Sequence, residues 1–112
     1  MKIYDMNRGT GKTSLLIQIS ATRGARIITA TENQAKVVKE MAKHMGRNIP
    51  EPMSYFSYKE YKGLIKEEIL IDELDCLIQY HLFPNTKLIA ATRSSSEYPP
   101  EYYELNIQGD KL

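Results

Sequence analysis

The sequence contains no tryptophan and a single cysteine, Cys76. One cysteine excludes an internal disulfide, and no cluster of cysteine and histidine residues has the spacing of a zinc site. Long apolar runs are also missing, so the sequence predicts no membrane span. The first residues lack the apolar stretch that is typical of a secretory signal. Together these absences predict a reduced, cytoplasmic protein with no membrane partner.

A surplus of charge of one sign is absent as well. The 15 Lys and Arg residues nearly balance the 14 Asp and Glu residues, which leaves a net charge of +1. Proteins that bind nucleic acid mainly through its phosphates are far more basic, so the net charge does not support nucleic acid as a partner, although it leaves that partner open. The hydrophobic fraction of 42% in 112 residues is enough for one core. Residues 1–112 are therefore expected to form a single domain.

Short apolar segments alternate with helical patterns along the chain. Strands are expected at 2–6, 25–30, 53–56, 68–72 and 87–92, with a last strand through Tyr103, Leu105 and Ile107. A first helix is expected over 12–23, and a second runs from a Thr31–Gln34 capping box to Gly46. A third is expected to begin at a Ser57–Glu60 capping box, with Tyr61, Leu64 and Ile65 facing inward. The fourth is indicated by the helical spacing of Leu74, Leu77, Ile78 and His81. This alternation is typical of an α/β fold. We expect three α/β/α layers and a mainly parallel sheet of about five strands.

A glycine-rich segment lies between the first expected strand and the first expected helix. The segment MNRGTGKT, which begins at Met6, fits the phosphate-binding pattern G-x-x-x-x-G-K-[ST] except that Met6 replaces the first glycine. Gly9 and Gly11 allow tight turns in which backbone N–H groups and the helix N-terminus face an anion. Lys12 would neutralise the β- and γ-phosphates, and the Thr13 hydroxyl would hold Mg²⁺. The alternative is an ordinary glycine-rich turn before a helix. The residues predicted to bind a nucleotide are Arg8, Gly9, Thr10, Gly11, Lys12, Thr13 and Ser14.

Two acidic residues, Asp72 and Glu73, follow the apolar segment Ile69–Ile71. In enzymes with a phosphate-binding loop, an aspartate at the end of a strand accepts a hydrogen bond from the loop hydroxyl or from a metal-bound water. Asp72 is therefore expected to order the Mg²⁺ ion together with Thr13. An adjacent glutamate can orient the attacking water as a general base, which is the role predicted for Glu73. Two acids after an apolar strand also occur by chance, but the carboxyl edge of a parallel sheet is where α/β folds bind ligands.

With both motifs in place, the chain resembles P-loop NTPases that carry a catalytic glutamate on a RecA-like core. Over roughly residues 1–95 it is similar to the N-terminal ATPase core of superfamily 1 helicases and phage terminases. Three further segments carry the resemblance: Thr29–Ala35, Ser54–Ser57 and Leu88–Arg93. The resemblance implies that the chain has the P-loop NTPase fold, binds ATP or GTP with Mg²⁺, hydrolyses the γ-phosphate, and is a phage or mobile-element protein linked to DNA metabolism. The alternative is a nucleotide-binding interaction or inhibitor module that docks on a host or phage protein with little or no turnover.

Hydrolysis in this family also needs an arginine beside the γ-phosphate. The motor proteins take it from a second RecA-like domain or from a neighbouring subunit. The resemblance therefore implies that a protein partner or self-association supplies an arginine here. Within the chain, the candidates for this arginine are Arg8 and Arg93. Arg93 is the one predicted to be catalytic beside Lys12 and Glu73, and a solvated loop arginine is the equal alternative. Cys76 and His81 are expected to pack at the edge of the core.

Overall fold

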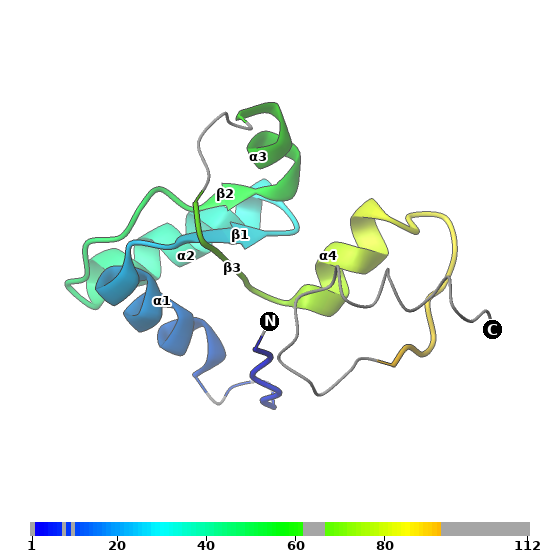
Figure 1. Cartoon of the computed structure of the whole chain (residues 1–112), viewed down its shortest axis with the longest axis horizontal. Coiled ribbons are helices and arrows are strands. Elements are labelled where there is room, and N and C mark those ends of the chain that lie inside the picture. The colour runs from blue at the N-terminus through cyan, green and yellow to red at the C-terminus, as the bar shows by residue number, and fades with distance from the viewer. Residues whose placement is uncertain (1, 8, 10, 62–66, 93–112) are drawn as a thin grey trace, which may run out of the picture.

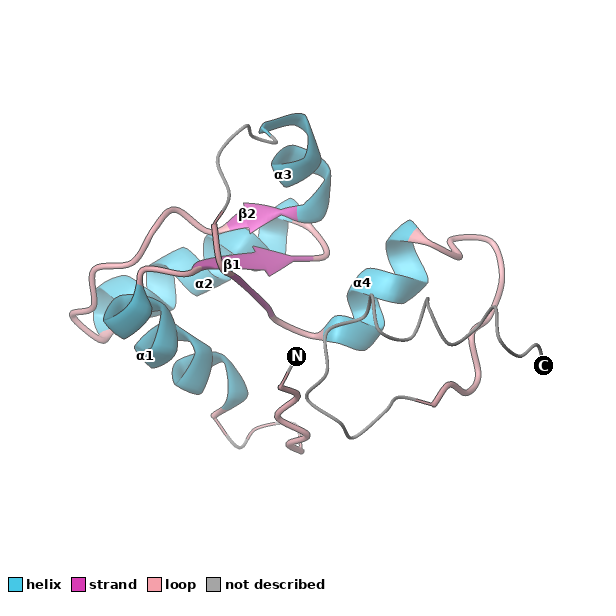
Figure 2. Ribbon diagram, in the orientation of Figure 1, coloured by secondary structure: helices cyan, strands magenta, loops and turns pink. Residues whose placement is uncertain are grey.

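The computed structural model describes residues 2–7, 9, 11–61 and 67–92. Within these ranges the chain forms helices and parallel strands in alternation, as Figures 1 and 2 show. In chain order the elements are α1 (Lys12–Arg23), β1 (Arg26–Thr29), α2 (Glu32–His44), β2 (Met53–Ser54), α3 (Tyr55–Tyr61), β3 (Ile69–Ile71) and α4 (Leu74–His81). The expected α/β class is confirmed.

The strands form one sheet with the order β2-β1-β3, and both pairs of neighbours are parallel. Ile28 of β1 is opposite Met53 of β2, while Ile27 of β1 is opposite Leu70 of β3. Parallel pairing brings the carboxyl ends of all these strands to one edge of the sheet. Whatever follows Thr29, Ser54 and Ile71 in the sequence therefore lies along that edge.

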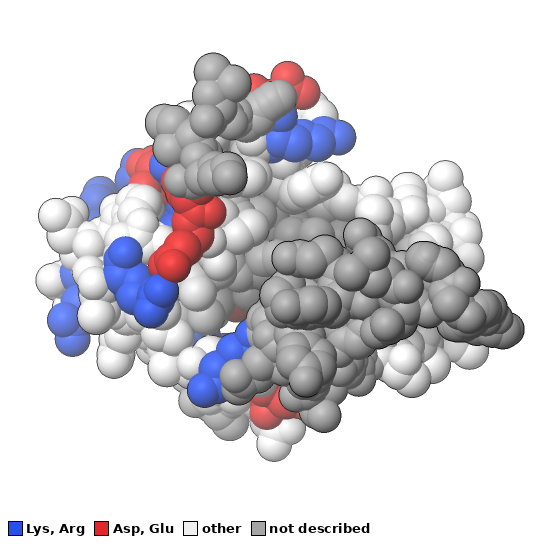
Figure 3. All heavy atoms as spheres, viewed as in Figure 1, with Lys and Arg blue, Asp and Glu red and all other residues white. Residues whose placement is uncertain are grey.

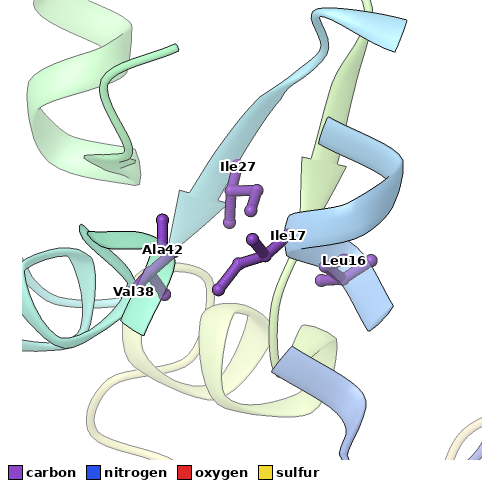
Figure 4. Packing of buried hydrophobic residues seen from close by; sticks show 5 residues of the cluster. All are labelled: Leu16, Ile17, Ile27, Val38 and Ala42. Atoms are coloured by element: carbon purple, nitrogen blue, oxygen red, sulfur yellow. The ribbon is translucent and has the colours of Figure 1, made fainter. Parts of the chain in front are cut away.

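The core lies where α1 and α2 pack on one face of β1. Ile17 of α1, Ile27 of β1 and Val38 of α2 are almost fully buried, and Figure 4 shows them together with Leu16 and Ala42. Leu70 of β3 packs against the same cluster from its position beside Ile27. Ala35, Val38 and Ala42 are the buried positions that the helical spacing predicts for α2.

The first of the expected capping boxes is confirmed. The Thr31 hydroxyl accepts a hydrogen bond from the backbone N–H of Gln34 at 3.2 Å, and the Gln34 side-chain oxygen accepts one from the N–H of Thr31 at 3.3 Å. At the other end of α2, Gly46 has a φ of 69° and its N–H donates to the carbonyl of Lys43. A left-handed glycine of this kind is the common way to end a helix.

The second expected capping box, Ser57–Glu60, is wrong. Helix α3 begins at Tyr55, because the Ser54 hydroxyl accepts a hydrogen bond from the N–H of Ser57 at 3.1 Å and so caps the helix earlier. The strand expected over 53–56 therefore ends at Ser54. Tyr61, expected to face inward, is 46% exposed. Leu64 and Ile65 lie outside the described residues.

The strands expected over 2–6 and 87–92 are also wrong, since neither range contains a strand. Residues 87–92 are all exposed, Ile89 at 83%, so the apolar pattern there has no core to pack against. The N–H of Leu88 donates to the side-chain oxygen of Gln79 instead of to a neighbouring strand. The last expected strand, at 103–107, lies outside the described residues. The described part of the sheet has three strands, fewer than the five or so expected.

Charged side chains of both signs lie close to one another on the face that Figure 3 draws, in keeping with the small net charge. No helix among the described residues is long and apolar enough to cross a membrane.

Candidate functional site

The glycine-rich turn leads into α1 through two residues with left-handed backbone angles. Gly9 has a φ of 78°, and Gly11, which precedes the first helical residue, has a φ of 88°. Such angles are unfavourable for residues with a side chain, which explains why glycine stands at both positions. No hydrogen bond from the side chain of a described residue caps this end of α1, and its first turn contains no acidic residue. The N–H groups there are therefore suited to an anion.

Thr13, in the first turn of α1, reaches the carboxyl end of β3. Its hydroxyl donates a hydrogen bond to Oδ2 of Asp72 at 3.0 Å, although the two residues are 59 positions apart in the sequence. Asp72 directly follows β3, and its own N–H donates to the carbonyl of Ile28 in β1 at 3.0 Å. The sheet therefore fixes Asp72 at the position where the sequence predicts a partner for the loop hydroxyl.

Asp72 is a buried carboxylate, with only 8% of its surface exposed. Burial raises its pKa above the usual carboxyl value, because water no longer solvates the charged form. The hydrogen bond from Thr13 acts in the opposite direction, while the nearby charge of Glu73 adds to the increase. The charge of Lys12 lowers the pKa of Asp72, and a further positive charge at this carboxylate would favour its ionised form as well.

Lys12 and Glu73 form an ion pair directly beside this hydrogen bond. The Lys12 Nζ atom lies 3.0 Å from Oε2 of Glu73, and the two side chains are 26% and 29% exposed. Lys12, which was predicted to bind the phosphates, is thus paired with Glu73, which was predicted to orient the attacking water. A ligand that takes up Lys12 would release the Glu73 carboxylate for another contact.

Glu73 has a left-handed backbone, with a φ of 63° and a ψ of 66°. It is the only described residue other than glycine with a positive φ. This conformation costs about 1–2 kcal/mol for a residue with a side chain. Glu73 is also the N-cap residue of α4, and its carbonyl accepts hydrogen bonds from the N–H groups of Cys76 and Leu77. The strained residue therefore lies where strand, helix and ion pair meet.

The oxygen donors of this site match the preference of Mg²⁺. A hard cation is bound by carboxylate and hydroxyl oxygens, and Asp72 and Thr13 offer one of each within hydrogen-bonding distance. A second cluster lies beside them, in which ligand atoms of Glu73, Asp75 and Cys76 fall within 4.8 Å of one another. Its mixture of oxygen and sulfur suits Mg²⁺ less well than the pair from Asp72 and Thr13.

A further polar group at the carboxyl edge of the sheet is not predicted by the sequence patterns. Glu32, the first residue of α2, accepts hydrogen bonds from the Ser54 hydroxyl at 2.6 Å and from the Ser57 hydroxyl. Both hydrogen bonds lower the pKa of Glu32, and the bond from Ser54 has the larger effect. Glu32 follows the strand expected at 25–30, whereas Ser54 lies inside the one expected at 53–56, so the sequence offered a signal for Glu32 alone.

The structure thus brings together Lys12, Thr13, Asp72 and Glu73, with Gly9 and Gly11 in the turn that leads to them. Ser14 is half-buried in the first turn of α1. Arg8, Thr10 and Arg93, the other predicted site residues, lie outside the described residues. Cys76 and His81 are both half-buried.

No family model, no curated protein and no solved structure matches this chain.

Proposed function

We propose that this chain binds a nucleoside triphosphate, ATP or GTP, with Mg²⁺ at the N-terminus of α1, and that it hydrolyses the γ-phosphate. The observation that carries the proposal is the hydrogen bond between Thr13 and Asp72, which joins two sequence motifs across 59 residues. An ordinary glycine-rich turn gives no reason for a buried carboxylate to lie at that hydroxyl. The P-loop NTPase fold, with helical layers on both faces of the parallel sheet, belongs to this proposal.

Each residue of the site has a distinct task in this proposal. The N–H groups after Gly11 and the Lys12 ammonium bind the phosphate oxygens. Thr13 and Asp72 would hold Mg²⁺, which when bound offsets the negative charge of the β- and γ-phosphates. Glu73, once Lys12 has moved to the phosphates, accepts a hydrogen bond from the attacking water and then takes its proton. An arginine from a partner protein or from a second copy of the chain would complete the charge around the γ-phosphate.

The proposal is tested first by nucleotide binding to the Lys12→Ala protein. The variant loses a charge-assisted contact, so the affinity for Mg·ATP and Mg·GTP should fall roughly 10- to 150-fold in calorimetry. Lys43→Ala is the matched control, because Lys43 is an exposed lysine in the last turn of α2. Equal affinities of the wild type and Lys12→Ala would refute the nucleotide site.

Turnover distinguishes an enzyme from a nucleotide-binding interaction module. Glu73→Gln keeps the size of the side chain and removes its basicity, so phosphate release should fall about 10²- to 10⁴-fold. The affinity for nucleotide should not fall, because the substitution removes the charge of Glu73 that competes with the phosphates for Lys12. Glu40→Gln, an exposed position on α2, serves as the control. Binding without release of phosphate by the wild type, in the presence and absence of DNA, would favour the interaction module.

A further inference from the structure

The direction of the Glu73 side chain depends on helix α4, and this helix packs only weakly on the described part of the protein. Glu73 caps the helix, and the N–H groups of Cys76 and Leu77 bind its carbonyl at 3.0 and 3.1 Å. Any tilt of α4 therefore moves Glu73 as well. None of the residues of α4 is buried, and Figure 1 shows the helix on the far side of β3 from α1 and α2. Within the described part of the chain, the orientation of α4 consequently depends on a small number of contacts.

His81, at the other end of α4, makes one such contact with the carboxyl edge of the sheet. Its Nε2 atom lies 2.8 Å from the carbonyl oxygen of Ala30, directly after β1. A carbonyl oxygen only accepts, so Nε2 is the nitrogen that carries the hydrogen. The His81 ring also meets the edge of the Tyr55 ring, with centroids 4.9 Å apart and an interplanar angle of 61°.

The partner of His81 is itself fixed. The N–H of Ala30 donates to the side-chain oxygen of Gln34 at 3.1 Å, so Ala30 belongs to the capped start of α2. Tyr55 is the first residue of α3. His81 thus joins α4 to two other helices as well as to β1. Eight helical residues span about 12 Å, so a contact at one end strongly limits the tilt at the other end, where Glu73 lies.

We propose that His81 is a positioning residue: its hydrogen bond to the Ala30 carbonyl fixes α4 and thereby keeps the Glu73 carboxylate beside Lys12. The consequence for turnover rests on the function proposed above, whereas the positioning itself does not. The contacts of His81 with described residues are those with Ala30 and Tyr55, and neither Lys12 nor Thr13 is among them. Its effect on hydrolysis is therefore indirect and passes through Glu73.

The positioning is measured without nucleotide, by zero-length carbodiimide cross-linking of Lys12 to Glu73 and mass spectrometry of the peptides. The ion pair of Lys39 in α2 with Glu51, which lies between α2 and β2, is an internal reference for the yield; its two atoms are 3.2 Å apart. His81→Ala should lower the Lys12–Glu73 yield roughly 2- to 10-fold relative to the reference, the population change expected for one lost hydrogen bond. His81→Gln, whose amide can reach the same carbonyl, should restore it.

Two further variants separate the hydrogen bond from simple packing. His81→Phe keeps a ring against Tyr55 but has no donor, so its cross-link yield should be as low as that of His81→Ala. If His81→Ala does not fold, His81→Phe alone tests the loss of the hydrogen bond. His44→Ala, at the exposed end of α2, should behave as the wild type. A wild-type yield in His81→Phe, or a yield in His81→Gln as low as in His81→Ala, would overturn the proposal.

Kinetics then connect the position of Glu73 with chemistry. In His81→Ala and His81→Phe, kcat should fall by a similar factor while the affinity for Mg·ATP stays unchanged, and His81→Gln should recover kcat. An unchanged kcat with a lowered cross-link yield would overturn the catalytic part of the inference. Absence of any hydrolysis by the wild type would refute the proposed function instead, and the cross-link yields would still decide whether His81 positions Glu73.

Discussion

The buried charge of Asp72 lowers the stability of the fold, whereas the proposed metal site requires that charge. The Asp72 carboxylate is buried, and burial raises its pKa above the usual value of 3.8. The folded protein therefore holds this proton at higher pH than the unfolded chain does. As the pH rises from 3.8 through the raised pKa, ionisation of Asp72 lowers the free energy of unfolding, and the full cost is present at neutral pH. A metal ion at this carboxylate would offset that cost.

This argument predicts that Asp72→Asn makes the nucleotide-free protein more stable at pH 7, on the order of 1 kcal/mol, while nucleotide binding loses its dependence on Mg²⁺. The asparagine oxygen can still accept the hydrogen bond from Thr13, so only the buried charge is removed. Urea unfolding at several pH values measures the first effect, and calorimetry with and without Mg²⁺ measures the second. Asp75→Asn, at an exposed position in the first turn of α4, is the control. A less stable Asp72→Asn protein would show that the carboxylate stabilises the fold.

Among the elements, α2 is the one that the sequence describes most completely. Its cap, its buried positions and its glycine end all depend on residues within a few positions of one another. The pattern at Ser57 fails because its hydroxyl instead binds Glu32, which is 25 residues earlier. A local pattern contains no information about such a distant partner. For the same reason, the apolar alternation at 2–6 and 87–92 does not suffice for strands, which require a neighbour to pair with.

The capping box of α2 leads to a prediction of stability. Thr31→Ala removes the side-chain oxygen that accepts from the Gln34 N–H and should lower the free energy of unfolding by about 1 kcal/mol. Thr31→Ser keeps the acceptor and should retain most of that stability. Thr22→Ala is the matched control, because the Thr22 hydroxyl donates to the Gln18 carbonyl within α1 and caps nothing. Equal urea midpoints for Thr31→Ala and Thr22→Ala would contradict the importance of the cap.

The site was predictable in part, because the two motifs place Thr13 and Asp72 at structurally defined positions. One lies at the start of a helix and the other at the end of a parallel strand, and both positions meet at the carboxyl edge of the sheet. The ion pair between Lys12 and Glu73 was not predictable, since it depends on the left-handed backbone of Glu73 and on the direction of α4. A local pattern also contains no information on tertiary contacts of α4 such as that of His81 with Ala30, which are 51 positions apart.

At the scale of the whole molecule, the site joins the part of the chain that contains the buried core to a part that contains none of it. All buried hydrophobic residues in the described part lie between Leu16 and Ala42, in and around α1, β1 and α2. No residue of β3 or α4 is both hydrophobic and buried, although β3 is paired with β1. The contacts of Lys12 and Thr13 with Glu73 and Asp72 connect these two parts. A ligand bound there would therefore contact the stable part and the less stable part together.

This distribution predicts a gradient in amide hydrogen exchange. Without ligand, the amides of α4 should exchange faster than those of β1 and of the buried face of α2, because opening of α4 exposes little apolar surface. Any opening that moves Glu73 and Asp72 also destroys the proposed nucleotide site. Mg·ATP at 100 times its Kd should therefore raise the free energy of that opening by up to about 2.7 kcal/mol, which slows exchange in α4 up to about 100-fold. Lys12→Ala at the same ligand concentration should keep only about 2- to 11-fold protection, because its affinity is expected to be roughly 10- to 150-fold lower. Exchange in α4 that stays unchanged, while calorimetry reports bound nucleotide, would mean that the ligand binds away from the edge where β3 meets α4.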